Sequence, residues 1–158
     1  MISGAFRLLA GIARETVLSR AFGIGAWAER ALELRVDHAS PYRPKVTLVA
    51  TYGAFHRGDF DIAESFAREV LADDPEASWA GLALSNVTAS RGGLEEAITL
   101  VEDMAQRPQL EPYDAHTVYG ILAIYRAVAG RHGDAQAAAE QAIEIATAVG
   151  QPSALALA

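Results

Sequence analysis

Four histidines and three pairs of acidic residues are the side chains in this sequence that come nearest to active-site chemistry. The histidines lie far apart, and no two of them have the spacing of a metal site on one helix; they are His38, His56, His116 and His132. The acidic pairs are Asp59 with Asp61, Asp73 with Asp74, and Glu95 with Glu96. Adjacent or alternate residues do not face each other on a helix, so these carboxylates are not expected to converge on one substrate atom.

Other catalytic motifs are missing as well. The chain has no cysteine, which excludes disulfides, thiolate nucleophiles and thiolate metal sites. The short glycine motif at 23–25 lacks the third glycine and the lysine of a phosphate-binding loop. No serine lies in a nucleophile-elbow motif. We therefore predict a protein that is not an enzyme and uses no cofactor or metal, with an unrecognised cleft of converging polar groups as the alternative.

Charge and hydropathy argue against two further classes of function. The 158 residues include 20 acidic and 13 basic side chains, which gives a net charge of −7. Direct nucleic-acid binding needs clustered basic residues, whereas here Lys45 is the single lysine and the arginines are scattered. The acidic balance disfavours an anionic membrane surface, and no run approaches the ~20 apolar residues of a membrane-spanning helix. We expect a cytoplasmic protein.

A glycine followed five residues later by an alanine recurs along the chain at intervals of roughly 34 residues. The pairs are Gly23 with Ala28, Gly58 with Ala63, Gly92 with Ala97, and Gly133 with Ala138. The last interval is longer because it contains the proline-rich segment 106–114. Each glycine separates two amphipathic patterns with the three- and four-residue steps of a helix. The repeat therefore predicts antiparallel helix pairs joined at a glycine turn.

Four such pairs account for most of the chain. We expect helices over 4–20 with 25–37, 44–57 with 60–73, 76–91 with 94–106, and 114–130 with 134–149. Asp59 is expected to cap the helix that follows Gly58, and the alanines are expected to let the paired helices cross closely. No strand is expected, because no stretch of β-branched residues alternates between polar and apolar positions.

The repeating unit resembles the tetratricopeptide repeat, a helix–turn–helix of 34 residues with small residues at the crossings and a closing proline. GDFDIAESFAREVLADDP (58–75) resembles it closely, and GGLEEAITLVEDM (92–104) resembles it with Gly93 in place of an acidic residue. Looser matches are GDAQAAAEQAIEIA (133–146) and GIGAWAERALEL (23–34). The composition also looks like that of the repeat region of a large bacterial multidomain regulator.

The resemblance implies an all-α fold, a right-handed solenoid of about four stacked antiparallel helix pairs in a single array over 1–158. Its units would cover about 1–40, 41–75, 76–112 and 113–150. Residues 151–158 would begin a further helix of a truncated unit. An array of this kind needs terminal helices with a polar outer face, and the segment PSALALA is apolar, so we expect the sequence to be a fragment.

In such a solenoid the first helix of each pair lines a concave groove. The family's groove positions fall here on Lys45, Tyr52, Phe55, Trp79, Asn86 and Arg131, among other residues. Some relatives clamp a terminal carboxylate with lysines and asparagines, but the corresponding positions here include Ala13, Val17 and Leu48. An apolar groove favours a helix or an apolar peptide instead.

Two functions fit these observations. The first is a non-catalytic protein–protein interaction module, a scaffold that binds a peptide or helix of a partner protein in its concave groove. The alternative is a regulatory segment of a larger bacterial signalling or transcriptional regulator, in which the groove contacts other domains of the same chain or a second copy of itself. Aromatic residues at helical spacing also pack into cores, so a purely structural role for Phe55 and Trp79 stays open.

Overall fold

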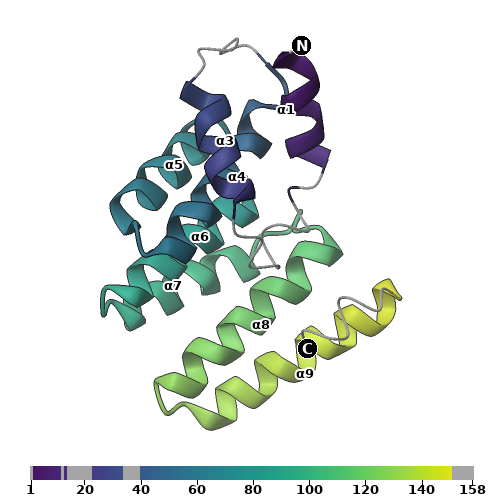
Figure 1. The fold of residues 1–158 in the computed structure, drawn as a ribbon. Coiled ribbons are helices and arrows are strands. Elements are labelled where there is room, and N and C mark those ends of the chain that lie inside the picture. The colour runs from purple at the N-terminus through teal and green to yellow at the C-terminus, as the bar shows by residue number, and fades with distance from the viewer. Residues whose placement is uncertain (1, 12, 14–22, 34–39, 151–158) are drawn as a thin grey trace. The chain divides into compact units, whose positions relative to one another are not determined.

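The computed structural model describes residues 2–11, 13, 23–33 and 40–150, and every regular element in these ranges is an α-helix (Figure 1). The helices are α1 (Ile2–Gly11), α3 (Ile24–Glu33), α4 (Arg43–Arg57), α5 (Phe60–Asp73), α6 (Ser78–Ser90), α7 (Leu94–Ala105), α8 (Pro112–Val128) and α9 (His132–Val149). The predicted all-α class is confirmed for this part of the chain. Predicted and observed helices from α4 onwards agree within about two residues at each end.

The chain divides into two compact units, Met1–Val87 and Thr88–Ala158, and the division falls inside α6. The first unit holds α1, α3, α4, α5 and most of α6, and the second holds the end of α6 with α7, α8 and α9. The predicted further helix at 151–158, and the ends of the predicted helices 4–20 and 25–37, lie outside the described residues. The division into four repeats stays a prediction.

Gly58 makes the turn between α4 and α5 as the sequence predicts. Its backbone is left-handed, with φ of 85°, a conformation that costs glycine little and other residues more. The amides of Gly58 and Asp59 donate to the carbonyl oxygens of Phe55 and Ala54, both at 3.0 Å. These two bonds satisfy the last carbonyl groups of α4 and reverse the chain direction within two residues.

Two of the predicted turn details are wrong. Gly133 lies inside α9, and the left-handed glycine of the α8–α9 turn is Gly130, with φ of 76°. The Asp59 side chain makes no capping bond to the start of α5. Its carboxylate instead accepts a hydrogen bond of 3.1 Å from Nε of Arg57, because the last turn of α4 brings that guanidinium beside it.

The core of the first unit forms where α4 packs against its neighbours. Helix α4 contacts α1, α3 and α5. Phe6 and Leu9 from α1 bury their side chains against Val46 and Val49 of α4. Ala63 of α5 is completely buried between Ala54 and Val87, so its small side chain lies at a helix crossing as predicted.

Helices α3 and α4 cross closely at two glycines. A Cβ atom built on Gly53 would lie 2.5 Å from Cα of Gly25, and the converse distance is the same. Beside this crossing, Arg57 of α4 donates to Glu29 of α3 at 2.7 Å. That bond is the largest cause that raises the pKa of Arg57 above its ordinary value, with burial opposing it, so the guanidinium stays charged.

In the second unit α8 packs against both α7 and α9, and a short turn joins α8 to α9 as a hairpin (Figure 1). Small residues allow this packing, since α9 turns four alanines inward, Ala135, Ala138, Ala142 and Ala146. Val118, Leu122 and Tyr125 of α8 are buried. On α7 the buried side chains are those of Ala97, Ile98, Val101 and Met104.

Candidate binding surface

Five of the six predicted binding residues lie in the first unit, on α4 and α6. Helical spacing places Lys45, Tyr52 and Phe55 on one face of α4, and Trp79 and Asn86 on one face of α6. We call these five residues the α4–α6 face. Contacts between the two helices hold them together, since Tyr52 packs with Ala83 and with the half-buried Trp79 in one apolar cluster.

Tyr52 joins the two helices directly. Its side chain is only 6% exposed, and its hydroxyl donates a hydrogen bond of 3.0 Å to the backbone carbonyl of Trp79. The ring packs against Ala67 of α5 and Ala83 of α6. Tyr52 therefore fixes the spacing of α4 and α6, and most of its contact area already serves the fold.

The other two aromatic residues are half-buried and keep part of each ring at the surface. Phe55 packs against Ala54, Ala63 and Val87, and its ring centroid lies 5.8 Å from that of Phe60. Trp79 packs against the Tyr52 cluster from the first turn of α6. Both rings are anchored by the core, so a ligand that met them would find rigid apolar surface at small cost in conformational entropy.

Polar groups stand at either side of these rings. Lys45 is exposed in the first turn of α4, close to its N-terminus, where its ammonium group can meet a carboxylate or a backbone carbonyl. Asn86 is half-buried two turns after Trp79 on α6. Its amide can both donate and accept hydrogen bonds, the pattern that a peptide backbone presents.

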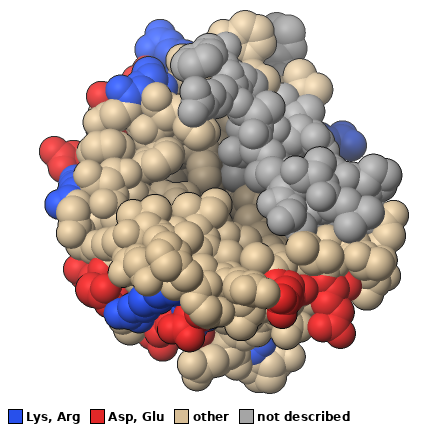
Figure 2. Space-filling model, turned by 90° about the horizontal axis from the view of Figure 1, so that it is seen from below, with Lys and Arg blue, Asp and Glu red and all other residues tan. Residues whose placement is uncertain are grey.

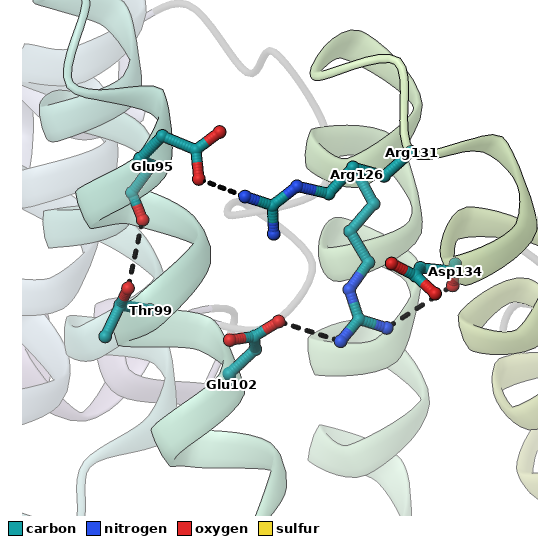
Figure 3. Close-up of polar contacts among 6 residues, drawn as sticks. All are labelled: Glu95, Thr99, Glu102, Arg126, Arg131 and Asp134. Carbon is teal, nitrogen blue, oxygen red and sulfur yellow. Dashed lines mark hydrogen bonds and ion pairs between the residues drawn. The ribbon is translucent and has the colours of Figure 1, made fainter.

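Arg131, the sixth predicted residue, belongs to the second unit. It lies at the start of α9, and its guanidinium forms an ion pair with Glu95 of α7 (Figure 3). The Arg131 side chain keeps 41% of its surface exposed and Glu95 keeps 69%. The structure therefore gives Arg131 an intramolecular partner, and this ion pair belongs to a different unit from the α4–α6 face.

A second arginine in the same view connects three helices of the second unit. Arg126 on α8 donates from Nη2 to Oε1 of Glu102 on α7 at 2.8 Å, and from Nη1 to the backbone carbonyl of Asp134 on α9 at 3.3 Å (Figure 3). Its side chain is 22% exposed. Nε of Arg126 is buried without a partner among the described residues. The two hydrogen bonds of Arg126 therefore tie α7 and α9 to α8.

The side of the surface drawn in Figure 2 carries both acidic and basic side chains. Figure 2 shows one side, on which acidic and basic side chains stand in small groups with uncharged residues covering much of the area between them. Within the described ranges, no three His, Asp or Glu side chains come together as a cation site requires. Of the helices that the structure describes, none is both long and apolar enough to cross a lipid bilayer.

Sequence reasoning missed three contacts between helices, two in the first unit and one in the second. The Gly25–Gly53 crossing has no local signature, because glycine inside a helix usually indicates a weak point rather than a contact. The Tyr52 hydroxyl bond and the Arg126 bridge join residues 27 and 24 positions apart. Local periodicity specifies which face a residue occupies but leaves its partners on other helices undetermined.

Neither protein-family models nor curated proteins give a match to this chain.

Proposed function

We propose that this chain is a non-catalytic protein–protein interaction module of stacked helix pairs, similar to a tetratricopeptide array, which binds a peptide or helix of a partner protein. One observation carries the proposal. Helices α4 and α6 are held side by side by the Tyr52 hydroxyl bond and its apolar cluster, and in the proposed array they are the first helices of two successive pairs. Stacked first helices of this kind form the ligand-binding face of helical repeat proteins.

The chemistry of the α4–α6 face indicates the ligand. Half-buried Phe55 and Trp79 offer apolar rings, and Asn86 offers an amide for a peptide backbone. Lys45 adds one positive charge at the edge of the face. The matching ligand is an apolar or amphipathic peptide that carries a carboxylate where it meets Lys45. We also place the protein in the cytoplasm, which agrees with the absence of cysteine.

Binding is tested with peptides selected from a random displayed library against the full 158-residue chain. Replacing Asn86 by alanine removes the amide, and we expect a loss of affinity of about tenfold, the effect of one to two hydrogen bonds. Gln136 on α9 is exposed and belongs to the second unit, so Gln136→Ala is the matched control and should bind as the wild type does. Equal affinity in all three proteins would contradict the proposed face.

The single lysine gives an independent readout. Acylation of Lys45 by an amine-reactive ester can be followed by mass spectrometry without interference from other lysines. A peptide bound on the α4–α6 face should slow the acylation of Lys45 and leave that of the N-terminal amine unchanged. If saturating peptide leaves the Lys45 rate unaltered, the ligand binds elsewhere.

A further inference from the structure

One face of α8 carries an uncharged stripe of three apolar residues and one threonine. Ile124 and Val128 lie one turn apart and are 56% and 71% exposed. Helical spacing places Ile121 and Thr117 on the same face towards the N-terminus, both half-buried. We call these four residues the α8 stripe. Large apolar side chains that are exposed together on one helix mark an interaction surface more often than isolated ones do.

The pattern of α8 is complementary to itself. No Asp, Glu, Lys or Arg occurs between Asp114 in the first turn and Arg126 in the last. Asp114 and Glu111 make the N-terminal end acidic, and Arg131 follows the C-terminal end. Arg131 keeps 41% of its side chain exposed beside Glu95, so a second acidic group can still approach it.

A single midpoint relates both the apolar and the charged residues. The point between Leu122 and Ala123 is equally far along the chain from Thr117 and Val128, from Ile121 and Ile124, and from Asp114 and Arg131. Two α8 helices that run antiparallel about this point would place Ile121 opposite Ile124, Thr117 opposite Val128, and Asp114 beside Arg131. Their helix dipoles would also be antiparallel, which is favourable.

We propose that the α8 stripe is the docking site of a second copy of this chain, with the two α8 helices antiparallel about a two-fold axis near Leu122. Such a contact is isologous: Thr117 of each copy meets Val128 of the other, so every pair occurs twice. The contact covers about three turns of one helix per copy. We expect it to bury less surface area than the ~1,200 Å² of a typical stable interface. The dimer is therefore weak and forms at micromolar concentrations or above.

Sedimentation velocity over a range of concentrations of the full chain tests the proposal without any added ligand. The wild type should show a monomer–dimer equilibrium, and Val128→Asp should raise the dissociation constant at least tenfold, because it places a buried carboxylate in the contact. Ile62 on α5 is a matched control, an apolar residue 45% exposed in the other unit. Its change to Asp should leave dimerisation as in the wild type. A wild type that stays monomeric at all concentrations would overturn the proposal.

Because the chain has no cysteine, a single introduced thiol reports the contact directly. Ile124→Cys lies close to the proposed axis and should give covalent dimers with a short bis-maleimide. Trp27→Cys on α3, at a residue 72% exposed, should give few. Equal cross-linking at both positions would overturn the two-fold contact. A chain that stays monomeric, and in which Val128→Asp abolishes binding of the selected peptides, would also overturn the two-fold contact. That result would make the α8 stripe the binding site of a different protein.

Discussion

Replacing Gly53 by alanine tests the close crossing of α3 and α4 at Gly25 and Gly53. The added Cβ would lie 2.5 Å from Cα of Gly25, whereas carbon atoms in contact are normally about 3.5–4.0 Å apart. Helices α3 and α4 must therefore separate by about 1 Å, and overpacking of this kind costs about 1–3 kcal/mol. The better helix propensity of alanine returns about 0.5–1 kcal/mol. We expect a net loss of up to about 2.5 kcal/mol in the free energy of unfolding.

Gly120 provides the matched control. It lies in the middle of α8, and a Cβ atom there would meet no other atom within 4 Å. Gly120→Ala should therefore show the propensity gain alone and stabilise the protein by about 0.5–1 kcal/mol. The two substitutions are chemically identical, so the difference between their effects isolates the steric cost at the α3–α4 crossing.

Urea denaturation followed by far-UV circular dichroism measures both free energies of unfolding. The double variant with alanine at Gly25 and Gly53 should depart from the sum of the single effects, because both substitutions act on one contact. If Gly53→Ala stabilises the chain as much as Gly120→Ala does, α3 and α4 do not approach each other closely at these glycines. The packing described for the first unit would then be wrong.

Four further substitutions test other contacts. Arg126→Gln should destabilise the protein by about 1–2 kcal/mol in urea denaturation, because it removes charge-assisted bonds from a mostly buried side chain. Arg131→Gln should cost less than about 1 kcal/mol, since its ion pair is more exposed; an equal loss at both arginines would contradict this ranking. Gly58→Ala should cost about 1–2 kcal/mol in thermal unfolding, because φ of 85° strains alanine, and an unchanged midpoint would exclude that strain. Arg57→Gln should cost less than about 1 kcal/mol, and this loss should shrink in high salt, where the pair with Glu29 is screened; a loss that does not depend on salt would mean that packing, not charge, provides the stabilisation.

Helix positions could be predicted from the sequence because they depend on local patterns. Phe60, Ala63, Ala67 and Val70 recur with helical spacing, and α5 begins at Phe60 as expected. The α8–α9 turn shows the limit of spacing rules. Gly130 and Gly133 both stand near the turn, and the repeat interval selected Gly133, whereas the left-handed residue that reverses the chain is Gly130.

The roles of the candidate residues depend on contacts between helices, which periodicity does not specify. Tyr52 and Lys45 share one face of α4, yet Tyr52 is buried against α6 while Lys45 is exposed. The difference arises because Trp79 and Ala83 of α6 cover α4 at Tyr52. Arg131 has an intramolecular partner for a similar reason, since α7 presents Glu95 to the start of α9.

The most direct test of the interaction-module proposal is a ¹H–¹⁵N NMR titration of the full chain with a selected peptide. We expect the largest shift changes at the Trp79 indole N–H and the Asn86 side-chain amide, with the Trp27 indole N–H as an internal reference that stays unchanged. Changes confined to residues outside α4 and α6, or none at a saturating peptide concentration, would contradict binding on the α4–α6 face.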